Sequence, residues 1–133
     1  MLLIDQAQLN KLNSMVWPEI RRLYQTEIQQ LKDDGFDGVV VLDAAILLEA
    51  EWNEDCNEVW VSIIPPSEAV QRIAERDKLT SEEATKRIGS QLSNSQRLAR
   101  ANLVLCSQWE PDVTALQVQT AWKNLQQHLS SEK

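Results

Sequence analysis

The spacing of hydrophobic residues predicts a long helix over residues 5–33. Apolar side chains recur there with a period of about 3.6 residues, at Leu9, Leu12, Val16, Ile20, Leu23, Ile28 and Leu31. Pro18 falls inside this pattern. We therefore expect the helix to kink there or a second helix to begin, because proline lacks an amide donor. Gly35 is expected to end the element in a turn.

Three short apolar runs predict strands over residues 39–43, 59–64 and 103–106. Continuous runs of β-branched and other apolar residues are typical of strands that are buried on both faces, as in a parallel sheet. The strands alternate with helical patterns, which indicates an α/β fold with a mainly parallel sheet. Three strands make a small parallel sheet, so we expect further strands to be missing from it.

Helix signals follow the second predicted strand. Ser67 is suited to cap a helix that runs to about Asp77. Thr80 and Glu83 have the spacing of a capping box and predict the start of another helix. The last helix is expected to begin near Pro111, with apolar positions at Val113, Leu116, Val118, Trp122, Leu125 and Leu129.

Composition narrows the class of protein. The chain has 133 residues, enough for one domain or part of one, and a formal net charge of −7, which argues against a nucleic-acid partner. No apolar run approaches the roughly 20 residues of a membrane span. The N-terminal residues lack the pattern of a secretory signal, and Cys56 and Cys106 have no ligand-type spacing. An intracellular protein with reduced cysteines is expected.

Positive charge is concentrated in residues 72–100. This stretch holds 7 of the 13 Lys and Arg residues but 4 of the 20 Asp and Glu residues, so it carries about +3 in an acidic chain. Arginine outnumbers lysine there by five to two, and guanidinium groups match phosphate oxygens geometrically. The stretch therefore either binds an anionic ligand or forms a solvated helix face with local pairs such as Glu83 with Arg87.

Several of these segments resemble the dephospho-CoA kinase family. The resemblance is carried by Val-Val-Leu-Asp-Ala-Ala-Ile-Leu-Leu-Glu at 40–49, by Glu-Ala-Val-Gln-Arg-Ile-Ala-Glu-Arg-Asp at 68–77, and by Arg87 and Gln91. Val-Trp-Pro-Glu-Ile at 16–20 and the Ala44-Ala45 pair look closest to the C-terminal kinase domain of animal bifunctional coenzyme A synthase. The order and spacing of the segments carry the match.

The resemblance implies a P-loop kinase that uses ATP and Mg²⁺ to phosphorylate the 3′-hydroxyl of dephospho-CoA. It implies a five-stranded parallel sheet, of which residues 39–43, 59–64 and 103–106 would be the third, fourth and fifth strands. Residues 1–133 would form a partial kinase domain, with a helical lid over about 72–100. The location would be cytoplasmic or mitochondrial.

The chain departs from that family at the phosphate loop. Its three glycines, Gly35, Gly38 and Gly89, are not followed by the Lys-Ser or Lys-Thr of a G-x-x-x-x-G-K-[ST] loop. The phosphate-loop strand and the presumed catalytic base are expected upstream of Met1. The chain alone should then be inactive, with the missing N-terminal half or a full-length synthase as a partner.

The resemblance also implies site residues on the lid. Arg76 is the first choice for an ATP phosphate contact and Arg87 for a phosphate contact on lid closure, and both are expected to serve catalysis. Arg72 and Arg97 are expected to join Arg76 in nucleotide binding. The alternative for Arg76 is an exposed salt bridge with Asp77.

A second group of candidates follows the first predicted strand. Asp43 stands at the strand's carboxyl end, where α/β sheets bind ligands, and could instead be a carboxylate satisfied by loop amides. Leu47 and Glu49 match the family's substrate side. No residue is assigned as a metal ligand.

Two other functions stay open. A truncated paralogue without catalysis would bind CoA-like nucleotides or a full-length partner. An unrelated helical module would use its basic segment to bind an acidic partner.

Overall fold

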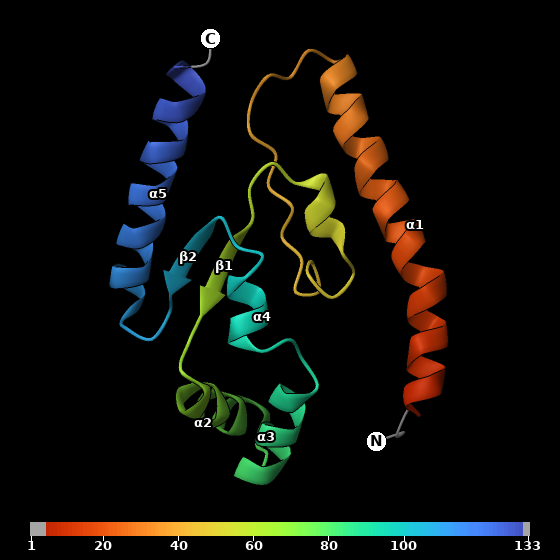
Figure 1. Cartoon of the computed structure of the whole chain (residues 1–133), viewed down its shortest axis with the longest axis vertical. Coiled ribbons are helices and arrows are strands. Elements are labelled where there is room, and N and C mark those ends of the chain that lie inside the picture. The colour runs from red at the N-terminus through yellow and green to blue at the C-terminus, as the bar shows by residue number, and fades with distance from the viewer. Residues whose placement is uncertain (1–4, 132–133) are drawn as a thin grey trace. The chain divides into compact units, whose positions relative to one another are not determined.

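The computed structural model describes residues 5–131, which divide into a unit ending at Trp52 and a unit beginning at Asn53. The elements in chain order are α1 (Gln6–Asp33), a 3₁₀ turn (Trp52–Asp55), β1 (Trp60–Ile63), α2 (Pro66–Asp77), α3 (Ser81–Gly89), α4 (Asn94–Leu98), β2 (Leu103–Cys106) and α5 (Pro111–Ser131) (Figure 1). The α/β class is confirmed.

The helix α1 is continuous across Pro18, so no second helix begins there. A proline inside a helix removes one backbone hydrogen bond, and an exposed helix can leave the freed carbonyl to water. The predicted end at Gly35 is confirmed. Gly35 has a φ of +81°, and the amides of Gly35 and Phe36 donate to the carbonyls of Lys32 and Leu31 at 3.0 and 2.9 Å. This is a Schellman motif, which needs a left-handed residue at that point.

Residues 39–43 have no regular secondary structure and pair with no strand of the described residues, so the first predicted strand is wrong. An apolar β-branched run favours extended backbone, but only a neighbouring strand converts it into sheet. The buried residues of this unit come later in the chain than residues 39–43. Leu48 is buried, and buried Trp52 meets the ring of Tyr24 edge-on, with centroids 5.6 Å apart.

The sheet of the described residues has two strands, whereas three of the family's five strands were predicted within this chain. β1 and β2 pair in parallel, with Trp60 opposite Leu103 and Ile63 opposite Cys106, and this confirms the other two predicted strands. Val59 and Val61 are buried beside this pair. The helix α5 packs against β2 and begins at Pro111 as predicted, and α4 packs against β1.

A side-chain amide satisfies the last residue of β2. The backbone amide of Cys106 donates to Gln117 Oε1 at 2.9 Å, and Gln117 Nε2 donates to the carbonyl of Cys106 at 2.9 Å. The side chain from α5 thus makes the two bonds that a neighbouring strand would make. It closes the outer side of β2 at its carboxyl end.

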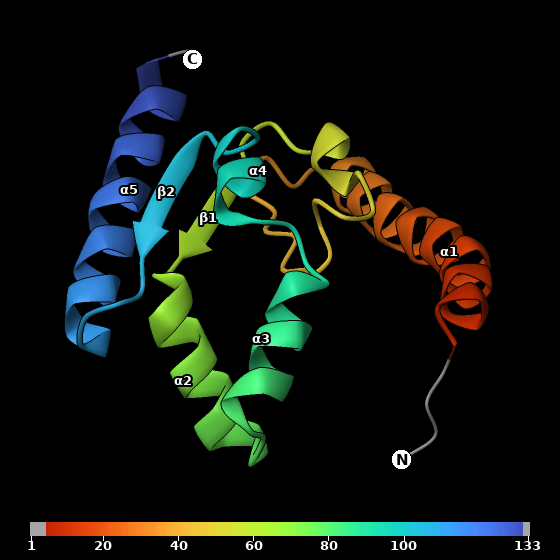
Figure 2. The ribbon, with the colours of Figure 1, turned by 60° about the horizontal axis from the view of Figure 1, so that its bottom comes forward.

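The crossover from β1 to β2 contains a helical hairpin formed by α2 and α3, which lie side by side (Figure 2). The helix α2 begins with Pro66 at its first position and Pro65 as its N-cap, so the predicted cap at Ser67 is wrong. Proline suits the first helical position because it has no amide to leave unpaired. The capping box is confirmed, with Thr80 as the N-cap of α3 and Glu83 as its reciprocal partner.

The turn between the two helices depends on a left-handed lysine. Lys78 has a φ of +54°, and the amide of Leu79 donates back to the carbonyl of Ala74 at 3.0 Å. This conformation reverses the chain, so that Ala84 of α3 becomes fully buried. It costs roughly 1 kcal/mol for a residue with a Cβ.

Replacing Lys78 with Gly should therefore raise the free energy of unfolding by up to about 1 kcal/mol, since glycine adopts this conformation without the Cβ penalty. Urea unfolding followed by circular dichroism measures the change. Lys123→Gly, inside α5, is the matched control and should lower stability by about 1 kcal/mol. A loss of stability in Lys78→Gly would show that the turn does not carry this strain.

Replacing Gln117 with Leu should lower the free energy of unfolding by about 1–3 kcal/mol, because the amide and carbonyl of Cys106 lose their partners. The same urea titration measures it. Gln126→Leu, further along α5, is the control and should change stability by less than about 0.5 kcal/mol. Equal effects of the two variants would contradict the edge-closing role of Gln117.

Candidate functional site

The candidate site is a cluster of three charged side chains on the α2–α3 hairpin. Arg76 donates to Asp77 from Nε to Oδ1 at 2.8 Å and from Nη2 to Oδ2 at 3.1 Å. Arg87 donates from Nη1 to the same Oδ2 at 2.5 Å. One carboxylate thus holds two guanidinium groups, which come from different helices. We call these three residues the arginine pair cluster.

The local fold explains how the cluster forms. Arg76 and Asp77 are the last two residues of α2, and Arg87 lies in the last turn of α3. Side chains of a helix lean toward its N-terminus, so Arg87 reaches back toward the turn that joins the helices. The left-handed Lys78 and the Thr80 cap fix that turn. The sequence therefore brings the two arginines together through local helix signals.

The charges in the cluster shift the pKa values of Asp77 and Arg76. The hydrogen bonds from Arg76 hold the pKa of Asp77 below its ordinary value of 3.8, and the positive charges of Arg76 and Arg87 add to this. The same contacts raise the pKa of Arg76. Asp77 keeps 22% of its side chain exposed, against 69% for Arg76 and 53% for Arg87. The carboxylate is therefore ionised and partly buried, while both cations remain open to a ligand.

Arg72 has a different role from the two cluster arginines. Its Nη1 and Nη2 donate to the carbonyls of Ser107 and Gln108 at 2.8 and 3.1 Å, and its Nε donates to Glu68 at 2.9 Å. These bonds tie α2 to the loop that follows β2. The predicted nucleotide contact of Arg72 stays a prediction, although much of its hydrogen-bonding capacity is used within the chain.

Arg97 also makes local bonds. Its Nε donates to the carbonyl of Leu92 at 3.1 Å, and its Nη2 donates to Gln91 Oε1 at 3.3 Å. Arg97 thereby stabilises the connection between α3 and α4. Its predicted contact with the nucleotide stays a prediction too.

The predicted substrate-side residues belong to the unit that ends at Trp52. Asp43 is exposed, and it does not end a strand because residues 39–43 form none. Leu47 and Glu49 are half-buried in a series of turns, in which the carbonyl of Leu47 accepts from the amide of Trp52 at 2.9 Å. The adjacent Leu48 is the buried residue of this segment. Their substrate role stays a prediction.

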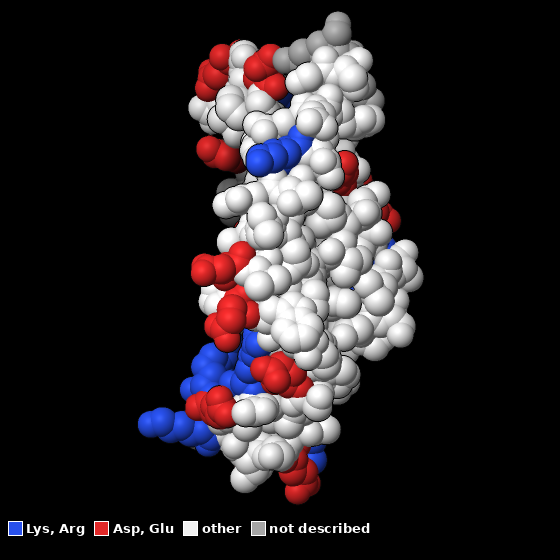
Figure 3. Space-filling view, turned by 90° about the vertical axis from the view of Figure 1, so that its left-hand side faces the viewer, with Lys and Arg blue, Asp and Glu red and all other residues white. Residues whose placement is uncertain are grey.

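Positive charge on the hairpin is interleaved with negative charge. Figure 3 shows Lys and Arg side chains gathered where α2 and α3 lie, with Asp and Glu side chains among them. Lys86 pairs with Glu82 at 2.9 Å, one turn apart. The expected pair of Glu83 with Arg87 is replaced, since Glu83 accepts from Thr80 and Arg87 turns to Asp77. The segment is thus a mixed surface with one shared-carboxylate cluster.

Sequence reasoning considered Asp77 only as a partner of Arg76. The missed feature is that Asp77 also receives Arg87 from the next helix. A usable signal was its position, because an acidic residue at the C-terminus of a helix opposes the helix dipole. Such a residue needs a compensating cation nearby.

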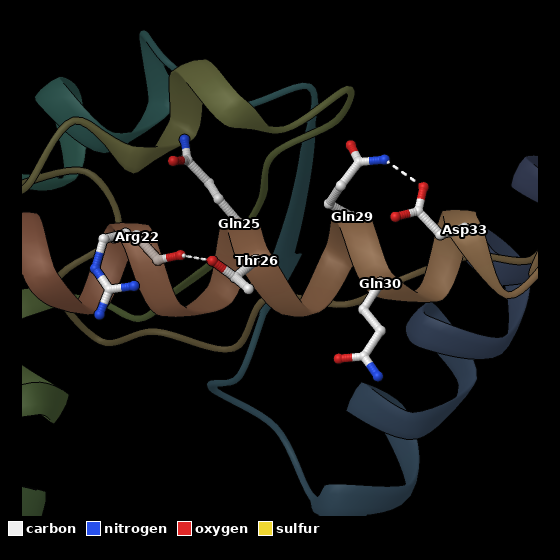
Figure 4. A pocket seen from close by; sticks show the side chains of 6 residues that line it. All are labelled: Arg22, Gln25, Thr26, Gln29, Gln30 and Asp33. Carbon is white, nitrogen blue, oxygen red and sulfur yellow. Dashed lines mark hydrogen bonds between the residues drawn. The ribbon is translucent and has the colours of Figure 1, made fainter.

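Shallow hollows lie elsewhere on the surface. One is lined by residues from a single face of α1, where Gln29 donates to Asp33 at 2.8 Å (Figure 4). Its lining residues are Arg22, Gln25, Thr26, Gln29, Gln30 and Asp33. This hollow contains none of the predicted site residues and is formed by one helix alone.

Within residues 5–131, no three or more His, Cys, Asp or Glu side chains gather to hold a metal ion. The described residues do offer guanidinium donors that fit phosphate oxygens. None of the helices in the same range has both the length and the apolar character of a membrane span.

These features describe an α/β protein whose crossover hairpin presents paired arginines, a kind of site that suits phosphate groups. A family model described as dephospho-CoA kinase matches residues 1–110. The chain therefore belongs to the dephospho-CoA kinase family. The matched range includes the whole hairpin.

Curated relatives carry the same description. The chain is similar to the dephospho-CoA kinase of Moorella thermoacetica, with 32% identity over 96% of this chain and 60% of that kinase. It is also similar to the dephospho-CoA kinase of Symbiobacterium thermophilum, with 30% identity over 90% of this chain and 49% of that kinase. The dephospho-CoA kinase of Fusobacterium nucleatum is 34% identical over 76% of this chain and 50% of that kinase. The chain thus spans about half the length of the curated relatives it matches.

Acid should weaken the contributions of Asp77 and Glu83 to the stability of the hairpin. Because the pKa of Asp77 is lowered on folding, its stabilising contribution is complete above its ordinary value of 3.8 and is lost as the pH falls further. The stabilising contribution of Glu83 is lost in the same way below pH 4.5, its ordinary pKa, since hydrogen bonds from Thr80 lower the pKa of Glu83 on folding. The stability difference between the native chain and Asp77→Asn should therefore shrink from pH 6 to pH 3. A constant difference in urea titrations would contradict this.

Proposed function

We propose that this chain serves the dephospho-CoA kinase reaction, in which the γ-phosphate of ATP passes to the 3′-hydroxyl of dephospho-CoA. Family membership supports the activity, and the arginine pair cluster within the matched range is the observation that carries it. The α2–α3 hairpin, which overlaps the lid expected over residues 72–100, would be the phosphate-facing part of a partial kinase domain over residues 1–133.

The chemistry of phosphoryl transfer gives the cluster its role. Negative charge spreads over the transferred phosphoryl oxygens, and catalysis consists of positioning and neutralisation. Each guanidinium has five N–H donors. Arg76 directs two of its donors and Arg87 one to Asp77, so both retain donors for phosphate oxygens. Closure of the hairpin over ATP would place these donors and exclude water.

Mg²⁺ would neutralise phosphate charge as part of the ATP complex. We assign no residue of this chain to it. Arg72 and Arg97 would contribute to nucleotide binding by stabilising the loop after β2 and the connection between α3 and α4, respectively. Asp43, Leu47 and Glu49 would contribute to the dephospho-CoA side.

We also propose that these 133 residues do not transfer phosphate by themselves. The printed sequence contains no glycine followed by Lys-Ser or Lys-Thr, and backbone amides of such a loop are what normally surround the phosphates. The chain would then act together with a phosphate-loop segment. Placement within a bifunctional coenzyme A synthase is a finer form of the proposal. The bacterial relatives named above, which are described simply as dephospho-CoA kinases, lend it no support.

A non-catalytic paralogue is the second candidate, and the sheet favours it. The carbonyls of Val59 and Ile63 accept bonds from the β2 side. Successive residues of a strand alternate, so the peptide groups of Trp60 and Ser62 face the other side, where residues 53–131 provide no strand. A partner chain could pair there. Because the 133-residue chain by itself is expected to be inactive under both candidates, absence of turnover in a protein that also contains a phosphate loop would mark this one.

Calorimetric titration of Mg·ATP into the 133-residue chain tests the phosphate role. Arg76→Ala and Arg87→Ala should each weaken binding about tenfold, as expected for the loss of a charge-assisted hydrogen bond. Arg22→Ala is the matched control, because exposed Arg22 also donates from Nε to a neighbouring carboxylate at 2.9 Å, that of Glu19. Its effect should stay below about twofold. Equal effects of all three would remove the phosphate role.

Activity is tested in a chimera in which this chain replaces the matching part of a full-length bacterial relative. Turnover of ATP and dephospho-CoA is expected in the chimera and not in the 133-residue chain. Arg76→Ala in the chimera should lower kcat more than it raises the KM for dephospho-CoA, because the lost contact acts in the transition state. An inactive, folded chimera would favour the non-catalytic paralogue.

A further inference from the structure

The two guanidinium groups of the cluster carry like charges, and they lie on separate helices. Both bind the same oxygen of Asp77, Arg76 from Nη2 at 3.1 Å and Arg87 from Nη1 at 2.5 Å. Two cations this close repel each other, and a negatively charged acceptor between them offsets that repulsion. The carboxylate of Asp77 is therefore what keeps the two cations together.

The position of Asp77 costs helix stability. It is the last residue of α2, where the partial negative charge of the helix end disfavours an acidic side chain. Arg76, one residue earlier, is the type of residue that this end favours. Helix stability alone would therefore favour a different residue at position 77. The presence of an aspartate there is explained instead by its contact with Arg87 on the other helix of the hairpin.

The geometry leaves the outer donors of both arginines available. Asp77 has 22% of its side chain exposed and binds the inner edges of the two guanidinium groups, which are 69% and 53% exposed. The cluster as a whole carries a net charge of +1. A polyphosphate could accept bonds from both guanidinium groups while Asp77 continues to hold them.

We propose that Asp77 is a positioning residue that holds Arg76 and Arg87 as a preformed pair for a single polyphosphate group. The inference rests on the phosphate role proposed above for the two arginines, and it adds the residue that makes them one site. Asp77 does not touch the phosphate. It offsets the repulsion between the arginines before the ligand arrives, which lowers the cost of binding.

Asp77→Asn tests the proposal, because competition and positioning predict opposite changes in the affinity for an anion. If Asp77 merely competed with the ligand for the arginines, loss of its negative charge would tighten anion binding. Positioning predicts the opposite, with binding of inorganic pyrophosphate to the full 133-residue chain about three- to fivefold weaker. Calorimetry at low ionic strength is suited to the measurement because salt screens exposed charges. Tighter or unchanged binding by Asp77→Asn would overturn the proposal.

Glu82→Gln is the matched control. It removes a negative charge from the same hairpin, where Glu82 pairs only locally with Lys86. Pyrophosphate binding should become tighter by less than about twofold. Asp77→Glu keeps the carboxylate and should recover part of the lost affinity. A loss in Glu82→Gln as large as that in Asp77→Asn would overturn the positioning role.

A double variant separates positioning from simple unfolding of the hairpin. In an Arg87→Ala background there is no pair to hold, so the added Asp77→Asn change should weaken binding by less than about twofold. An undiminished loss in that background would assign Asp77 a structural role only and would overturn the proposal. Circular dichroism of each variant checks the helix content.

The choice of probe separates this inference from the proposed function. If the native chain binds pyrophosphate but not Mg·ATP, the nucleotide role fails, and the sign of the Asp77→Asn effect still decides the inference. If it binds Mg·ATP and Asp77→Asn leaves pyrophosphate binding intact, the inference alone fails. No binding of either anion overturns both.

Discussion

The parallel pairing of β1 with β2 is the constraint from which the rest of the second unit follows. Parallel strands cannot be joined by a tight turn, because the chain must return to the starting edge of the sheet. Residues 64–102 make that return, and the α2–α3 hairpin is part of it. Since α2 begins directly after β1, the hairpin is anchored at the carboxyl end of a strand. In α/β proteins ligands bind at that end.

Arg72 links the hairpin to the second strand. Its two bonds to carbonyls of Ser107 and Gln108 hold α2 against the loop that follows β2. The carboxyl ends of both strands are thereby tied to the same helix. Gln117 adds a fixed point on the outer side of β2. These side chains supply part of the bonding that additional strands would supply to a small sheet.

Local signals account for the parts of the fold that the sequence predicts well. The Gly35 end of α1, the capping box of Thr80 with Glu83 and the start at Pro111 each depend on a few neighbouring residues. The apolar run at residues 39–43 shows the limit of such signals. Its residues favour extended backbone, but strand formation needs a hydrogen-bonding neighbour, and no local pattern reveals whether one is present.

The candidate site, like the fold, could be predicted only in part from local sequence signals. The type and number of residues over 72–100 indicate a role in binding an anion, and the resemblance to a kinase family singles out Arg76 and Arg87. Neither indicates which cations are engaged within the chain. Arg72 binds carbonyls more than 30 residues away, and Arg87 binds Asp77 rather than the nearby Glu83. Such choices depend on the packing of α2 against α3, which sequence spacing does not encode.

Net charge is consequently a poor guide to what this hairpin binds. A surplus of about +3 over residues 72–100 suggests a broadly attractive surface, but most of these charges have a partner in the chain. Under the proposed phosphate role, selectivity for a polyphosphate has to come from geometry instead. Two guanidinium groups held at one carboxylate present their remaining donors together, whereas paired charges spread over a helix face would attract any anion weakly. The specific property of the segment is thus the spacing between its two cations, and a single acidic residue sets it.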